Sequence, residues 1–167
     1  VLNNEGLSAI LIYFVIYLFM NLGAFYIVML IANKTGSEDI EDYKGIGPKA
    51  PFVTLALAIF LVSLTGLPPT AGFVGKLYLF AALLNSGWTW LAIVGAINSV
   101  ISLYYYARVF RNMYLRSDER HTKLTLDFSY GQKLIVMVLL IPVLLFGLYF
   151  PPLVQLAQAS LKIFGTP

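Results

Sequence analysis

The sequence predicts an all-α integral membrane protein with four transmembrane helices, the second of them broken, and a short helix at the membrane interface. Hydrophobic residues make up 59% of the chain and charged residues 11%, and the mean hydropathy is +0.81. Soluble domains carry about 25% charged residues, so this composition indicates a membrane chain. Each of four charge-free runs is long enough to cross about 30 Å of hydrocarbon, which takes roughly 20 helical residues. The runs are Gly6 to Asn33, Ala50 to Gly75, Leu77 to Ala107 and Leu134 to Leu161.

The first span is expected at about residues 7–32, a run interrupted only by Ser8, Asn21 and Gly23. A loop follows at 33–49. It contains several glycines, a proline and charges of both signs, which are typical of turns exposed to water.

The second apolar run contains its own break. Pro51 to Leu84 would form a helix of about 51 Å, which is too long for one straight crossing. Neither Pro68 nor Pro69 can donate a backbone hydrogen bond, and each biases its predecessor away from helix. Gly66 and Gly72 add conformational freedom on either side. We therefore expect a discontinuous span at 52–84, broken at Gly66–Pro69, with half-helices at about 52–65 and 70–84. The alternative is that the Pro-Pro pair only kinks a single membrane helix.

The rest of the chain supplies two more spans and a tail. Trp88 and Trp90 mark a membrane interface, and the cluster beginning at Arg108 marks a return to water. After Pro151-Pro152, apolar residues alternate with Gln155, Gln158 and Lys162, which suits a helix lying in the interface. The predicted segments are spans at 88–110 and 131–150, a loop at 111–130 and an interfacial tail at 153–164, all within one membrane domain at 1–167.

The distribution of cations predicts the orientation. Four crossings place the loops at 33–49 and 108–133 on one side and both chain ends on the other. The first side holds nine lysines and arginines, whereas the second holds only Lys162. The nine are Lys34, Lys44, Lys49, Arg108, Arg111, Arg116, Arg120, Lys123 and Lys133. By the positive-inside rule the loops are cytoplasmic and both ends of this fragment lie on the outer side. The net charge of +3 follows from this topology, so no nucleic-acid partner is expected.

Composition also limits the chemistry of this chain. The sequence contains no cysteine and one histidine, so it offers no disulfide, thiolate metal site or iron–sulfur cluster. We therefore expect no metal and no cofactor to be bound by this chain.

Lys76 lies between two long charge-free stretches, residues 50–75 and 77–107. A cation near the bilayer centre costs about 2.5 to 3.5 kcal/mol on insertion scales, so such residues usually serve ion or proton paths. Helical side chains tilt toward their own N-terminus, so the ammonium should point back toward the break. The alternative is that Lys76 extends outward to the interface, over about 13 Å of helix. We expect a proton relay at Lys76. Since no acidic residue lies inside a predicted span, its counter-charge should come from elsewhere.

Four polar residues are candidates for holding relay waters: Asn21, Ser63, Thr65 and Thr70. The alternative is that they satisfy the broken backbone or pack helices together. Other polar residues are given structural roles: helix contacts for Asn98, Ser99 and Ser102, cytoplasmic anchors for Arg108 and Arg111, an aromatic belt for Tyr104 to Tyr106, and a solvated position for His121.

Three blocks of sequence closely resemble the antiporter-like subunits of complex I. They are Leu18-Phe19-Met20-Asn21-Leu22-Gly23-Ala24-Phe25, the run from Ser63 to Lys76, and Ser102-Leu103-Tyr104-Tyr105-Tyr106-Ala107-Arg108-Val109. The block at Gly72-Phe73-Val74-Gly75-Lys76 is shared with the wider family, which includes the M and L subunits and sodium/proton antiporter complexes. The other two blocks favour the N type, called chain 2 in mitochondria and B in chloroplasts. The resemblance covers nearly the whole chain.

This resemblance implies that the chain looks like the last four helices of a fourteen-helix subunit, part of a larger antiporter-like bundle. Lys76 would match the family's proton-relaying lysine on its discontinuous helix. The implied protein is a non-redox, proton-translocating subunit of NADH:quinone oxidoreductase, in a bacterial inner membrane in preference to an organellar one. Its partners would be lipids and the other membrane subunits, including neighbouring antiporter-like subunits. Flavin, iron–sulfur clusters and quinone would lie in other subunits. The start at Val1, without a methionine or a basic leader, suits a C-terminal piece of a longer protein.

Two other functions are left open. A subunit of a sodium/proton antiporter complex would use the same lysine for ion exchange. A short structural or assembly membrane protein would pair Lys76 with a neighbour and move no proton.

Overall fold

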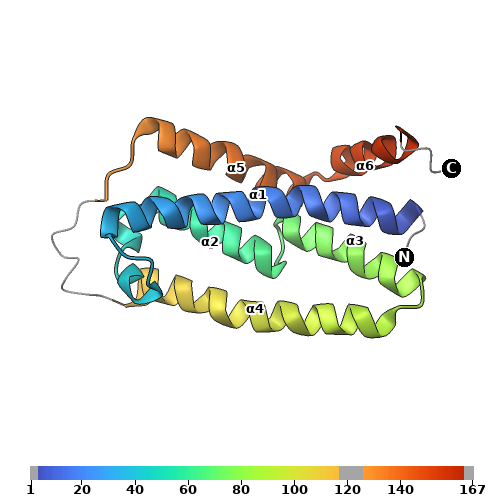
Figure 1. The fold of residues 1–167 in the computed structure, drawn as a ribbon, viewed down its shortest axis with the longest axis horizontal. Helices are drawn as coiled ribbons and strands as arrows, with labels where there is room; N and C mark the ends of the chain where they lie inside the picture. Colours follow the sequence, from blue (N-terminus) through green and yellow to red (C-terminus); the bar gives the residue numbers. More distant parts are fainter. Residues whose placement is uncertain (1–3, 117–125, 164–167) are drawn as a thin grey trace.

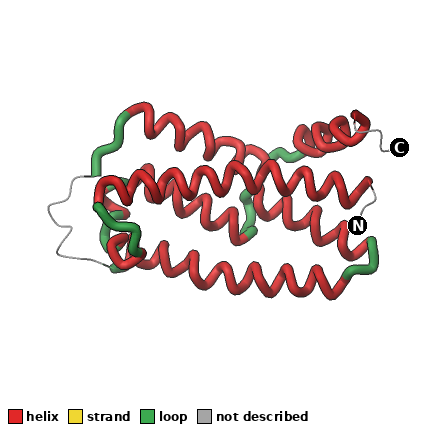
Figure 2. Tube along the Cα trace, viewed as in Figure 1, coloured by secondary structure: helices red, strands yellow, loops and turns green. Residues whose placement is uncertain are grey.

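The computed structural model describes residues 4–116 and 126–163, and these residues form helices joined by loops, with no strand among them. The helices are α1 (Asn4–Thr35), α2 (Pro51–Thr65), α3 (Ala71–Asn85), α4 (Thr89–Leu115), α5 (Tyr130–Leu148) and α6 (Pro151–Ile163) (Figure 1). Two short 3-10 turns, η1 (Ile40–Tyr43) and η2 (Gly47–Lys49), lie between α1 and α2. The predicted all-α membrane fold class is thereby confirmed (Figure 2).

Helix α1 runs through the middle of the bundle, and the other helices are arranged around it. It contacts α2, α3, α5 and α6. Helices α2 and α3 follow one another end to end, separated by a short loop, and α4 packs against both of them (Figure 1). This arrangement places the end of α2 and the start of α3 between α1 and α4. Ser63, Thr65 and Thr70 on either side of the break are buried, whereas Leu67, Pro68 and Pro69 within it are exposed.

The buried face of α1 explains its central place. Ile12, Ile16, Met20, Ile27 and Ile31 are spaced by one or two helical turns, so they share one face, and all are at most 1% exposed. This face packs on α2, where Leu57 and Phe60 are also buried. Lipid tails are as apolar as these side chains, so close van der Waals packing, rather than escape from water, stabilises such contacts in a bilayer.

Three of the described helices, α1, α4 and α5, are long and apolar enough to cross a membrane. Helices α2 and α3 have 15 residues each, about 22 Å, which is short of a hydrocarbon core of about 30 Å. Helices α4 and α5 also expose large apolar side chains; Val100 is 69% exposed and Leu148 is 74% exposed. Such surfaces suit lipid or further membrane helices.

The helix bounds differ from expectation mainly in α4, which continues to Leu115, beyond the expected end at residue 110. Asn112 and Met113 are buried there against the loop that follows α1, so tertiary packing extends the helix past its first arginines. Arg108 and Arg111 consequently lie on α4 and not in a loop. Arg120, His121 and Lys123, and the end of the tail at residue 164, lie outside the described residues.

The loop between α1 and α2 is fastened to the end of α4. Asn112 Nδ2 donates to the Ile40 carbonyl at 3.0 Å, and the Gly45 N–H donates to the Asn112 carbonyl at 3.2 Å. Glu41 forms ion pairs with Lys44, with Arg108 at 3.4 Å and with Arg116 at 3.9 Å. The hydrogen bond from Lys44, and then the charges of the neighbouring cations, lower the pKa of Glu41.

We expect Glu41→Gln to loosen this loop. A carboxyl whose pKa is lower in the folded state contributes stability above its ordinary pKa of 4.5 and loses that contribution as the pH falls through the lowered value. Hydrogen–deuterium exchange of residues 38–46 at pH 7 should therefore be faster in the variant. The wild type should approach the variant below pH 4.5, after correction for intrinsic rates. Asp127→Asn is the control, because Asp127 pairs only loosely with Lys133, at 3.9 Å. Equal exchange in wild type and Glu41→Gln would contradict this role.

Candidate proton-carrying site at the helix break

The break between α2 and α3 begins with a left-handed glycine. Gly66 has φ of +88°, a conformation that L side chains rarely adopt, and it ends α2. Its N–H donates to the Ser63 carbonyl at 3.0 Å, and the Leu67 N–H donates to the Val62 carbonyl at 3.2 Å. Pro68 and Pro69 follow, joined by a cis peptide bond. The predicted half-helices at 52–65 and 70–84 agree with α2 and α3 to within one residue at each end.

Lys76 satisfies the remaining carbonyls at the end of α2. The last four carbonyls of a helix lack partners within it. The N–H groups of Gly66 and Leu67 bond two of them, the carbonyls of Ser63 and Val62. Lys76 Nζ donates to the other two, the Leu64 carbonyl at 3.0 Å and the Thr65 carbonyl at 2.8 Å. The side chain therefore extends back to the break from its place on α3. The negative end of the α2 dipole faces the ammonium.

The third partner of Lys76 comes from α4. Nζ donates to Ser99 Oγ at 2.9 Å, so the ammonium has three acceptors for its three N–H groups. Across residues 4–116 and 126–163, no carboxylate forms an ion pair with Lys76. The charge is thus held by carbonyl and hydroxyl dipoles in this part of the chain.

A pocket of about 310 Å³ opens beside Lys76. Its lining is Tyr13, Tyr17, Leu64, Lys76, Leu79, Phe80, Gly95, Asn98, Ser99, Ser102, Tyr105 and Tyr106. Leu64, Tyr105 and Tyr106 also line a second pocket of about 290 Å³, which extends toward Glu38. Space for water therefore lies on the side of Lys76 that faces α1 and α4.

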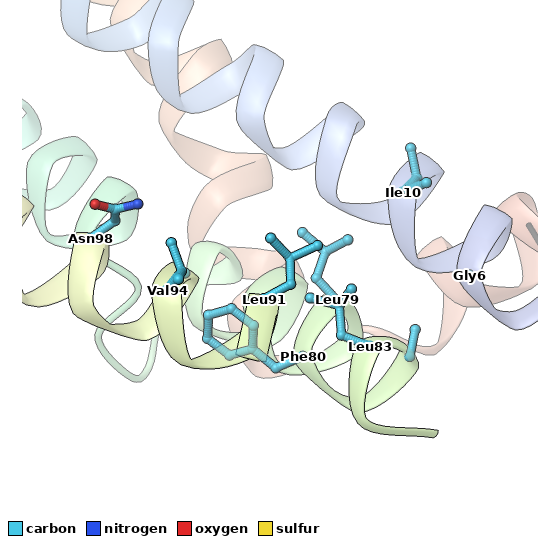
Figure 3. Close-up of a pocket in the computed structure, with 10 residues that line it drawn as sticks. Gly6, Ile10, Leu79, Phe80, Leu83, Leu91, Val94 and Asn98 are labelled. Carbon is cyan, nitrogen blue, oxygen red and sulfur yellow. The ribbon is translucent and has the colours of Figure 1, made fainter. Parts of the chain in front are cut away.

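A third, apolar pocket of about 370 Å³ adjoins the lysine pocket (Figure 3). Leu79, Phe80, Gly95 and Asn98 line both of them. Asn98 lies at one end of the view, and the other labelled side chains are apolar. The polar surroundings of Lys76 therefore give way, beyond Asn98, to an apolar region between α1, α3 and α4.

The predicted water-holding residues are placed differently from one another. Ser63 Oγ lies across the break, where it accepts from the Gly72 N–H at 3.0 Å and lies 2.8 Å from Met20 Sδ. Thr65 and Thr70 donate to the carbonyls of Leu61 and Leu67. Asn21 lies on α1, donates to the Tyr17 carbonyl and lines the second pocket. The three hydroxyls satisfy the backbone around the break, as the alternative expectation had it, and their role toward water stays a prediction.

Two features near Lys76 were not anticipated from the sequence. Ser99 was expected to be a helix contact, and its hydroxyl instead binds the lysine ammonium. Tyr105 and Tyr106 were assigned to an interfacial belt, but both line the lysine pocket. No local signal distinguishes these residues, because their place depends on how α4 packs against α3.

Replacing Ser63 by alanine should destabilise the protein by about 1 to 3 kcal/mol, because the buried Gly72 N–H would lose its acceptor. Thermal unfolding of the purified protein measures this loss. Ser160→Ala is the matched control, since the Ser160 hydroxyl is exposed and donates to the carbonyl one turn earlier. A drop in proton movement per folded molecule, without a loss of stability, would instead favour the water-holding role.

Comparison with known proteins places the chain in a family. Residues 1–102 match the family model described as NADH:quinone oxidoreductase/Mrp antiporter, TM. The chain belongs to this family of membrane proteins. The match covers α1, the break, Lys76 and Ser99. All three hydrogen-bond partners of Lys76 Nζ therefore lie within the residues that match the family model.

Curated relatives of the family extend the likeness to the whole chain. The NADH-quinone oxidoreductase subunit N 2 of Chloroherpeton thalassium is 47% identical over 167 residues, which are 99% of this chain and 33% of the relative. The corresponding protein of Sorangium cellulosum is 46% identical over 98% of this chain and 33% of its own. The NAD(P)H-quinone oxidoreductase subunit 2 of Gloeobacter violaceus is 40% identical over 95% and 32%. The chain thus spans about one third of the length of these relatives, and the predicted resemblance is confirmed.

Proposed function

We propose that this chain is part of a non-redox membrane subunit of NADH:quinone oxidoreductase and that it carries protons through Lys76. The observation that supports this most is the set of contacts around Nζ. A cation at a helix break, bonded to two backbone carbonyls and one hydroxyl beside a pocket, is held firmly and yet has room for water. The membership of the chain in the family and its similarity to subunit N proteins support the choice of NADH:quinone oxidoreductase as the complex.

In this proposal the redox chemistry occurs elsewhere. Flavin, iron–sulfur clusters and quinone belong to other subunits, and those subunits and neighbouring antiporter-like subunits are the partners of this chain. Quinone reduction changes the charge near Lys76 through groups outside the chain. Lys76 takes up or releases a proton in response. Helices α2 and α3 together make one discontinuous crossing.

We further propose that the protein lies in a bacterial inner membrane with the loop after α1 on the cytoplasmic side. Lys44, Arg108 and Arg116 gather around Glu41 at one end of the bundle, where the loop meets the end of α4 (Figure 1). A cluster of cations at one membrane surface fits the cytoplasmic side.

A second candidate is a subunit of a sodium/proton antiporter. It is favoured by the family description, which names the Mrp antiporter beside the oxidoreductase. The same lysine site would then serve ion exchange without a redox partner.

Capture of the protein from detergent-solubilised membranes separates the two candidates. An antibody against the exposed loop at residues 36–42 should bring down the other membrane subunits with NADH:quinone reductase activity. Proton movement in the reconstituted sample should continue without sodium. Capture without reductase activity would contradict the proposal, and proton movement that requires sodium would favour the antiporter.

A further inference from the structure

The three contacts of Lys76 Nζ are chemically unequal. The Leu64 and Thr65 carbonyls are acceptors only, whereas the Ser99 hydroxyl is both a donor and an acceptor. A lysine that carries protons alternates between an ammonium, with three N–H donors, and an amine, with two N–H donors and one lone pair. Two carbonyls suit the two donors that both states share. The third position requires a partner that accepts in one state and donates in the other.

Ser99 meets this requirement. With the ammonium present, the Ser99 O–H donates to the Gly95 carbonyl at 3.0 Å, one turn earlier on α4, so an oxygen lone pair is free to accept from Nζ. When Nζ becomes neutral, rotation of the same hydroxyl about its Cβ–Oγ bond turns its hydrogen from the Gly95 carbonyl to the nitrogen lone pair. All three contacts of the nitrogen are then kept in both states.

The packing of α4 against α3 places Ser99 Oγ within 2.9 Å of Lys76 Nζ. At Gly95 an added Cβ would lie 2.9 Å from the ring of Phe80, so the missing side chain allows α4 to approach α3 closely. Ser99 follows one turn later on the same face and reaches Nζ. Ser102 donates to the Ser99 carbonyl at 2.7 Å and does not bond to Nζ.

We propose that Ser99 is the switching partner of Lys76, accepting a hydrogen bond from the ammonium and donating one to the amine. The N–H that faces Ser99 is the one that breaks, because the other two stay on the carbonyls. This N–H bends from Ser99 Oγ toward a water molecule in the adjoining pocket, the water accepts the proton and becomes hydronium, and the electron pair of the broken N–H bond stays on nitrogen. Ser99 keeps its own proton throughout. This inference rests on the proposed function. It adds a second residue to the lysine site and identifies the N–H from which the proton leaves.

The test measures the initial rate of NADH-driven proton translocation in closed membrane vesicles, per assembled complex. Ser99→Ala should lower the Lys76-dependent part of the rate, which is the part lost in Lys76→Met, about tenfold, as expected for the loss of one hydrogen bond to a charged group. Ser99→Thr keeps the hydroxyl and should retain most of the rate. Ser160→Ala is the matched control, because the Ser160 hydroxyl also donates to the carbonyl one turn earlier but lies on α6, and it should resemble the wild type.

The outcomes separate this inference from the proposed function. A wild-type rate in Ser99→Ala, with the rate lost in Lys76→Met, would overturn the role of Ser99 and leave the role of Lys76 standing. An equal loss in Ser99→Ala and Ser99→Thr would assign Ser99 to packing and also overturn it. A comparable loss in Ser160→Ala would show that the effect is not specific to the hydroxyl beside Nζ, and would overturn it as well. A wild-type rate in both Lys76→Met and Ser99→Ala would end both proposals.

Discussion

Replacing Lys76 by methionine is expected to abolish proton translocation through this subunit, and so to lower the number of protons moved per electron, while the protein still assembles. Methionine has similar length and no ionisable group, so the variant holds no proton at this site. The Leu64 and Thr65 carbonyls lose their donor, and each unsatisfied group costs about 1 to 3 kcal/mol. The pocket of about 310 Å³ is large enough for water, which occupies about 30 Å³ per molecule, so water replaces the ammonium there.

The measurement is the number of protons moved per electron by inverted membrane vesicles, with the amount of assembled complex determined in parallel. Lys133→Met is the control, because Lys133 is a half-exposed lysine near the start of α5. It should leave the ratio unchanged. An undiminished ratio in Lys76→Met would falsify the proton-carrying role.

Replacing Gly72 by alanine is expected to cause the largest loss of folded protein. A Cβ at Gly72 would overlap the Ser63 carbonyl and lie 2.9 Å from Met20 Sδ, so α1, α2 and α3 meet at this point. The carbonyl belongs to the helix backbone and moves only if α2 and α3 separate. We expect a destabilisation of about 3 kcal/mol or more, at the upper end for an overpacked core.

The amount of complex in the membrane and its thermal midpoint after purification both report this loss. Gly131→Ala on α5 is the matched control, since a Cβ there meets no atom within 4 Å. It should be neutral or slightly stabilising, because alanine favours helix over glycine. Normal yield and stability of Gly72→Ala would mean that the two half-helices pack less closely than the structure describes.

The break and the direction of Lys76 were predictable because local chemistry decides both. Two adjacent prolines in the middle of an apolar run interrupt a helix, and a left-handed turn beside them favours a glycine such as Gly66. The backward tilt of helical side chains then brings Lys76 to the last carbonyls of α2. These features depend on neighbours within about one or two turns of helix, which the sequence presents directly.

The partners of Lys76 and the end of α4 were not predictable in this way. Ser99 is 23 residues from Lys76 in the chain, and its contact depends on the close packing of Gly95 against Phe80. Helix α4 continues through arginines that suggested a loop, because Asn112 bonds to the loop after α1. Serines and threonines near a break offer hydroxyls to water or to backbone alike, and only the folded geometry shows that Ser63 bonds the Gly72 N–H.

The most direct single test of proton carriage by Lys76 is the proton-to-electron ratio of Lys76→Arg. A guanidinium keeps the positive charge and several N–H donors for the carbonyls at the break, yet it does not release a proton at physiological pH. If Lys76 works by giving up and regaining a proton, the arginine variant will assemble and will not translocate protons at this site. A wild-type ratio in Lys76→Arg would show that a fixed positive charge is sufficient and that Lys76 carries no proton.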